Sequence, residues 1–172
     1  TEGDRVFPTE EFIWEQLKKA PAEFVVEAKN PEDNMTLGGM NRNYAAGYGC
    51  PAILQADGSL RDATIEDYIK FAKIIHQSPL FKINGGILAQ PNEVAPDLAS
   101  LAMVYAAMLH SDKCLFIVPE TEGKYRQLMD LCVAWWGSRE AFTSAPHTMT
   151  MISTLSPLQM DKMALDSIML CA

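Results

Sequence analysis

The sequence has few cysteines, and their spacing is not that of a metal site or a disulfide framework. The 172 residues include four, Cys50, Cys114, Cys132 and Cys171, which lie far apart and form no CxxC pair. Three of them fall in apolar segments, where cysteine usually behaves as a small hydrophobic residue. We therefore predict no bound metal and a reducing, cytoplasmic compartment.

Long hydrophobic runs and clusters of positive charge are also missing. No run of about 18 apolar residues could span a bilayer, and no signal-peptide pattern opens the chain. Lysine and arginine number 14 against 22 aspartates and glutamates, which gives a net charge of −8. Since no long basic run is present, the sequence predicts neither a nucleic-acid nor a membrane partner.

Common nucleotide and hydrolase motifs are absent as well. No GxGxxG, Walker, HExxH or GxSxG pattern occurs, so nucleotide-dependent and common hydrolytic mechanisms receive no support. The three histidines form no metal-ligand cluster. We interpret His76 and His110 as residues near helix ends, and His147, at the start of a strand, as structural.

Strand and helix patterns alternate four times from Tyr44 onward. The expected strands are 44–49 (with 52–55 as a possible continuation), 81–88, 114–118 and 147–153. The expected helices, each with apolar residues at helical spacing, are 64–78, 97–111, 121–137 and 157–172. Capping boxes open the first of these at Thr64 and the last at Ser156, with Pro157 in the first helical position. Four successive βα units predict a parallel sheet in an α/β fold.

A different pattern precedes these units. Thr9 caps an expected helix that Pro21 ends, and a turn at 30–34 joins two expected strands, 24–28 and 35–37. We therefore divide the chain into a helix and β-hairpin extension, 1–43, and the first half of a TIM (β/α)8 barrel, 44–172. A complete barrel has about 250 residues. We expect both ends to continue into a longer polypeptide.

The candidate site residues lie in loops that follow the strands, where barrels of βα units carry their chemistry. Four segments qualify: Gly47–Pro51, Asn84–Pro91, Pro119–Glu120 and Ser153–Pro157. Tyr44 and Tyr48 are interpreted either as part of an aromatic cage for a trimethylammonium group or as core residues. Gly47 and Gly49 either admit a ligand to the backbone or merely shape a turn.

Polar side chains in the same loops complete the candidate set. Asn84 and Gln90 flank the loop after the second strand, and Glu120 is the best-placed carboxylate, at a helix entrance. The dipole of that helix explains Glu120 as well as a functional role does. No residue of this chain is identified as catalytic.

The run 38–51, together with Leu54–Gly58 and Arg61–Thr64, resembles the trimethylamine methyltransferase family. Members of that family have a similar Gly-rich strand end, a short Asp-Gly turn, and an Ala-Thr that opens a helix. Further matches lie at His110–Lys113 and Ser156–Leu158. The resemblance extends over almost the whole chain from about Phe24 onward, and its specificity comes from the order and spacing of the motifs.

The resemblance implies a TIM barrel that transfers a methyl group from a methylamine to the cobalt of a separate corrinoid protein, in methylamine metabolism or methanogenesis. A quaternary amine such as glycine betaine is the expected substrate. The corrinoid would be carried by the partner protein, with none bound directly by this chain, and we expect a homo-oligomer. The residues implied at the substrate or corrinoid mouth are Tyr44, Gly47, Tyr48, Gly49, Asn84, Gln90 and Glu120.

Three alternatives stay open at this point. The first is a trimethylamine methyltransferase proper, of the type that carries pyrrolysine in a later strand. The second is a non-catalytic module that binds quaternary amines, and the third is an unrelated TIM-barrel enzyme. Because four βα units leave two open strand edges, we also expect the isolated chain to self-associate or aggregate.

Overall fold

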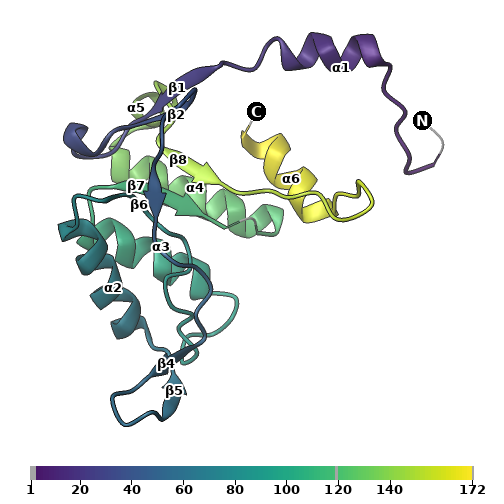
Figure 1. The fold of residues 1–172 in the computed structure, drawn as a ribbon. Coiled ribbons are helices and arrows are strands. Elements are labelled where there is room, and N and C mark those ends of the chain that lie inside the picture. The colour runs from purple at the N-terminus through teal and green to yellow at the C-terminus, as the bar shows by residue number, and fades with distance from the viewer. Residues whose placement is uncertain (1–2, 119, 172) are drawn as a thin grey trace.

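The computed structural model describes residues 3–118 and 120–171, which fold into a mixed α/β structure around a parallel sheet (Figure 1). The sheet has four strands in the order β3-β6-β7-β8, all parallel. Their bounds are β3 Tyr44–Ala45, β6 Phe81–Asn84, β7 Cys114–Ile117 and β8 Thr148–Thr150. The predicted succession of parallel βα units is therefore confirmed. Within the described ranges the sheet stays open and does not close into a barrel.

Helices follow each of these strands. They are α2 Ile65–Gln77, α3 Ala99–His110, α4 Glu122–Trp136, the short α5 Arg139–Thr143, and α6 Lys162–Cys171. The predicted capping box of α2 is confirmed, since the Thr64 side chain accepts from the Asp67 amide and Asp67 accepts from the Thr64 amide. Gly137, with φ +94°, ends α4 in the left-handed conformation. Helix α5 was not predicted from the sequence.

The amino-terminal part also follows the prediction. Helix α1, Glu10–Leu17, begins at Thr9, whose hydroxyl accepts from the Phe12 amide at 3.2 Å. It stands apart from the sheet and has no buried residue (Figure 1). Strands β1 Glu23–Val26 and β2 Met35–Gly38 form an antiparallel hairpin about the 3-10 turn η1, Pro31–Asp33. Whether residues 1–43 form a separate domain stays a prediction.

The hairpin is tied to the amino ends of the sheet strands. The Glu27 amide donates to Pro146 O at 2.8 Å, just before β8, and the Cys114 thiol of β7 donates to Val26 O at 3.6 Å. Asp33 lies 3.4 Å from the Lys82 ammonium and 3.8 Å from that of Lys113, a side chain that is almost fully buried. This end of the sheet is consequently closed by the extension.

Three predicted boundaries are wrong. The strand expected at 44–49 ends at Ala45, and 52–55 belongs not to it but to a separate hairpin of β4 Ala52–Leu54 and β5 Leu60–Asp62. Gly49, with φ +83°, turns the chain out of the sheet direction before that hairpin. The strand expected at 81–88 ends at Asn84, where the chain enters a loop that lies over β7.

The last helix also begins later than predicted. Residues 155 and 159 exchange two backbone hydrogen bonds, of 2.6 and 2.7 Å, which hold Ser156–Leu158 in a turn. Asp161 replaces Ser156 as the cap of α6, accepting from the Ala164 amide at 2.7 Å. Ala172, the expected end of this helix, lies outside the described residues. None of the helices in the described ranges combines the length and apolar character that a bilayer crossing requires.

Candidate functional site

The sheet has one face covered by helices and one face without them, and strand register assigns each side chain to a face. Aligned residues of parallel strands point the same way. Leu115 and Ile117 of β7 belong to the large core that α2, α3 and α4 cover. The alternate residues of β7, Cys114 and Phe116, belong to a second cluster with Ile83 and Met149. We call the face that carries this second cluster the helix-free face.

The two ends of the helix-free face differ in exposure. Toward the amino ends of the strands, Val26 and Met35 of the hairpin bury Cys114. Toward the carboxyl ends, Phe116 is only half-buried, and Met151, beyond β8, is 56% exposed. A ligand can therefore approach the helix-free face at the carboxyl ends of the strands, the end at which parallel α/β sheets bind ligands.

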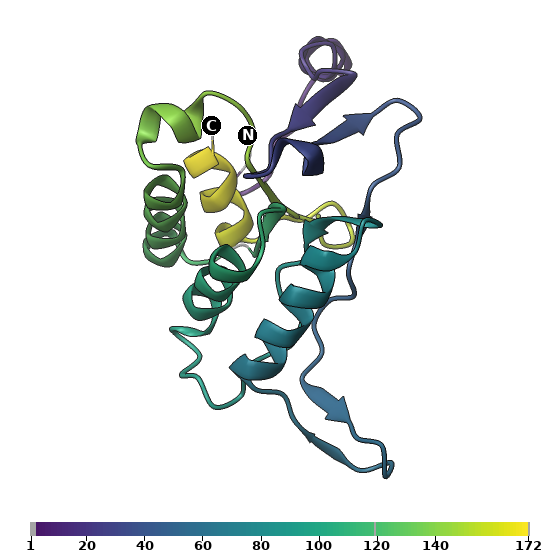
Figure 2. The same cartoon turned by 90° about the vertical axis from the view of Figure 1, so that its left-hand side faces the viewer.

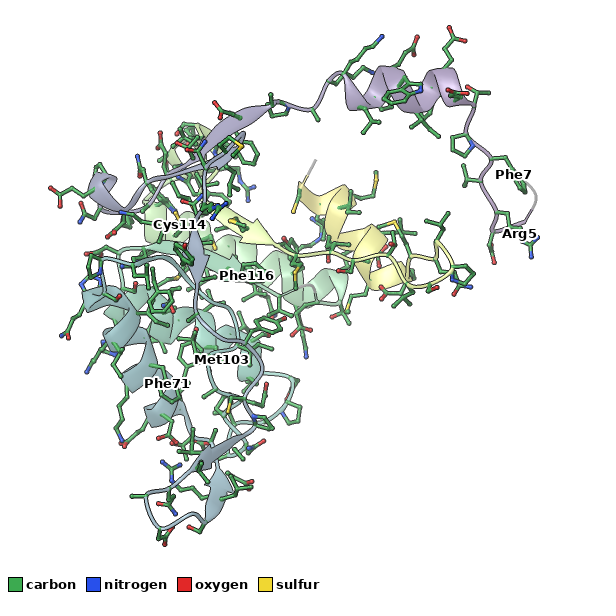
Figure 3. The ribbon with its side chains drawn as sticks, in the orientation of Figure 1. Arg5, Phe7, Phe71, Met103, Cys114 and Phe116 are labelled. Carbon is green, nitrogen blue, oxygen red and sulfur yellow. The ribbon has the colours of Figure 1, made fainter. Side chains whose placement is uncertain are left out.

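Tyr48 and Phe116 meet at this end. Their ring centroids are 6.1 Å apart and the planes are inclined at 76°, an edge-to-face arrangement. Figure 3 shows Phe116 on the central sheet. Tyr48 comes from the loop after β3 and is half exposed. The loop is held by a hydrogen bond of 2.7 Å from the Gly49 amide to Ile87 O.

Phe116 is not among the residues predicted for the site. The period-two alternation of Cys114 and Phe116 could have placed it on the same face as the second cluster. Its pairing with Tyr48 depends on strand order, which the sequence does not reveal. Tyr44 is 51% exposed at the start of β3, and because β3 is only two residues long, Tyr48 lies in the loop beyond this strand.

Gly86 lets the loop after β6 lie directly on β7. A Cβ at this position would stand 2.9 Å from the carbonyl oxygen of Phe116 and 3.2 Å from its ring. Nothing lies within 4 Å of a Cβ at Gly47 or Gly49, so only the positive φ of Gly49 restricts the residue type there. Because of this close approach, the backbone and the ring of Phe116 lie directly against the loop after β6.

The polar candidates lie at separate places. Asn84 is buried, and neither amide atom has a partner within the described part of the chain. Its register with Leu115 puts it on the helix-covered face. The backbone amide of Gln90 donates to Cys50 O at 2.8 Å, and Glu120 lies 4.0 Å from the Lys124 ammonium one turn along α4. Pro119 lies outside the described residues.

An apolar hollow of about 300 Å³ lies beside Tyr48. Tyr48, Gly47 and Cys50 form one wall, and Phe71 and Ile74 of α2 form the other. Figure 3 labels Phe71 on α2. Ile74 is 59% exposed. The hollow is therefore an open edge of the structure next to the aromatic pair rather than an enclosed cavity.

The buried thiols and His147 offer no reactive group at this end of the sheet. Burial raises the pKa of Cys114 to about 11 and that of Cys132 to about 12, so both stay protonated near neutral pH. His147 precedes β8 and stacks on Trp136 with centroids 3.7 Å apart, while its Nε2 lies 3.0 Å from Ala141 O. Across the described ranges, no three His, Cys, Asp or Glu side chains gather in a way that would hold a metal ion.

A family model and a known protein both match this chain over all or nearly all of its length. The family model described as trimethylamine methyltransferase covers residues 1–172. The chain is also 35% identical, over 168 residues, to the glycine betaine methyltransferase of Desulfitobacterium hafniense (strain Y51). That alignment takes in 98% of this chain and 35% of the relative, so the chain spans about a third of the length of that curated relative.

Proposed function

Since the chain belongs to the trimethylamine methyltransferase family, we propose that this protein moves a methyl group from a quaternary amine, glycine betaine first, to the cobalt of a corrinoid protein. The observation that supports this substrate is the 35% identity to a glycine betaine methyltransferase over 98% of the chain. Trimethylamine is the second candidate, because it is the amine in the description of the matching family.

The proposed fold is a (β/α)8 barrel, of which the four parallel strands and their helices form one part. In that fold the helix-free face is the inner wall, and the carboxyl ends of the strands form the mouth. The proposed compartment is the cytoplasm, which agrees with four free cysteines in the described ranges.

The chemistry requires little acid or base from the protein. A quaternary nitrogen leaves with the electron pair of the broken C–N bond as a neutral amine, so no proton has to reach the leaving group. The corrinoid, when its carrier protein is docked, supplies the cobalt nucleophile that accepts the methyl carbon. The task of this chain is to hold the methyl group in line and to exclude water.

The aromatic pair suits that task. A ring face attracts a trimethylammonium group through its negative quadrupole, and the attraction strengthens when water is excluded. Tyr48 and Phe116 present two rings at a large mutual angle at the open end of the helix-free face. We assign the methylammonium contact to this pair. Tyr44, which pairs with Phe81 at the start of β6, is a further candidate nearer the amino end of the sheet. Gly47 and Gly49 then shape the loop that carries Tyr48.

The polar candidates take supporting roles in this proposal. The backbone amide of Gln90 fixes the loop after β6 to Cys50, and the Glu120 side chain pairs with Lys124 at the start of α4. Asn84 faces the helices, so we do not assign it to the substrate.

The test is a methyl-transfer assay of the intact protein with a reduced corrinoid protein and a panel of amines. We expect demethylation of glycine betaine to dimethylglycine, with trimethylamine, proline betaine and carnitine as weaker substrates. A preference for trimethylamine would select the second candidate. No transfer from any amine of the panel would overturn the enzymatic proposal, and binding without transfer would support a non-catalytic module.

A further inference from the structure

A β-hairpin projects from the same end of the sheet as Tyr48. It comprises residues 50–63, with β4 and β5 paired antiparallel, and we call it the arm. Figure 2 shows the arm at the lower edge of the molecule, extending away from the helices. It connects the end of β3 to the start of α2, so it belongs to the first loop at the carboxyl end of the sheet.

The base of the arm is firmly held. The Arg61 guanidinium donates two hydrogen bonds, of 2.6 and 2.8 Å, to the carboxylate of Asp67 in α2. This guanidinium holds the pKa of Asp67 well below its usual range. Asn92 of the loop after β6 donates through its side chain to Pro51 O at 2.7 Å and through its backbone amide to Ala63 O at 3.0 Å. Both ends of the arm are therefore fixed to the body of the protein.

The contact between Arg61 and Asp67 determines which face of the arm is exposed to solvent. Residues 53 and 61 are partners across the arm, so the face that carries Arg61 is turned toward α2. Leu54 and Leu60 are the next partners along the ladder and point to the opposite face. They are 69% and 70% exposed. Asp62 lies on the same face and is exposed, which leaves an apolar pair next to a charged neighbour.

We propose that Leu54 and Leu60 form a docking contact for the corrinoid protein that accepts the methyl group. The inference rests on the proposed function. A methyl acceptor carried by a protein must cover the open end of the helix-free face, and Cys50, at the base of the arm, lines the same hollow as Tyr48. A protein seated over Tyr48 meets the arm beside it. An exposed apolar pair surrounded by polar and charged residues is a surface that a protein partner can bury, because the core of an interface is more apolar than its rim.

The test compares two acceptors of the methyl group. The variant Leu54→Ser/Leu60→Ser is assayed with the corrinoid protein and, separately, with free reduced cobalamin, which has no protein surface to dock. We expect the KM for the corrinoid protein to rise about tenfold, while the KM for the amine and the rate with free cobalamin stay unchanged. Leu54→Met/Leu60→Met, which keeps the apolar surface, should restore the KM.

The matched control is Leu80→Ser. Leu80 is 56% exposed just before β6, at the amino end of the sheet, so its loss should leave the KM for the corrinoid protein unchanged. An unchanged KM in the arm variant would overturn the docking proposal. The docking proposal would also be overturned if the arm variant dissociated from an oligomer, because the two leucines would then contact a second copy. A fall in its Tm would overturn it too, because the leucines would then pack within their own chain. Failure of the proposed function is distinct, since the unaltered protein would then transfer no methyl group to either acceptor.

Discussion

The ring of Tyr48 stands edge-on to the ring of Phe116, with centroids 6.1 Å apart and planes inclined at 76°. The two residues are separated by 68 positions and come from the loop after β3 and from the middle of β7. Their meeting gives the open end of the helix-free face an aromatic wall. The proposed recognition of a methylammonium group depends on this wall.

Loss of either ring should weaken the binding of the transition state for methyl transfer. We expect Tyr48→Leu and Phe116→Leu each to lower kcat/KM for glycine betaine about tenfold or more, because one cation–π contact in a desolvated site contributes about 1–2 kcal/mol. Tyr48→Phe should retain most of the activity. The control is Tyr105→Leu, which removes a ring that is 55% exposed on α3. Equal losses in Tyr48→Leu and Tyr105→Leu would contradict the assignment.

Gly86→Ala should disturb the same site through the backbone. The added methyl group would lie 2.9 Å from Phe116 O, so the loop must move off β7. We expect a loss of about 1–3 kcal/mol in the free energy of unfolding, measured by urea denaturation, together with a higher KM for the amine.

Gly123→Ala serves as the control for this substitution. Nothing lies within 4 Å of a Cβ at Gly123, and the residue is in the first turn of α4. Alanine there should raise the free energy of unfolding by as much as about 1 kcal/mol. If both variants changed stability in the same direction, close approach at Gly86 would not be the cause.

Asp33→Asn should be strongly destabilising. Asp33 is the carboxylate next to the buried ammonium of Lys113, and burial lowers the pKa of that lysine. Removal of one partner of a buried ion pair costs about 3–5 kcal/mol. We expect a loss toward the lower end of this range, because the Lys113 ammonium still donates to the carbonyls of Ser78 and Phe81. Asp130→Asn is the control, since Asp130 and Arg139 form an exposed pair and should contribute no more than about 1 kcal/mol. Comparable effects of the two substitutions on Tm would refute the structural role of Asp33.

The pair of Arg61 and Asp67 should make stability depend on pH in the acid range. Hydrogen bonds from Arg61 lower the pKa of the folded Asp67 below its ordinary value of 3.8. The stabilisation is therefore complete above about pH 4 and is lost as the pH falls toward the folded pKa. Asp67→Asn should flatten the fall in the free energy of unfolding below pH 4, measured by denaturant titration at each pH. Asp112→Asn, at an exposed carboxylate, should leave the slope unchanged.

Local signals in the sequence predicted the elements well where the responsible contacts are also local. Thr9 and Thr64 cap helices as expected, because a cap requires only residues within one turn. Ser156 has the same kind of capping pattern but does not cap a helix, because the hydrogen bonds between residues 155 and 159 hold it in a turn. The hairpin at 52–62 was missed for a related reason: its strands pair with each other rather than with the sheet.

The candidate site was predicted in part. Residues after strands could be named from topology, and Tyr48 does lie at the open end of the helix-free face. Phe116 could not be joined to it without the register of β7, and Asn84 could not be assigned to a face without its alignment to Leu115. These relations are set by non-local pairing, which a single sequence does not specify.

The fate of a labelled methyl group tests the central proposal most directly. The intact protein is incubated with glycine betaine labelled on its N-methyl carbons and with reduced corrinoid protein, and label in the corrinoid protein is measured against dimethylglycine formed. The proposal predicts one labelled methyl group on the corrinoid protein for each dimethylglycine, with Tyr48→Leu slowing both equally. Dimethylglycine without labelled corrinoid protein, or neither product, would contradict it.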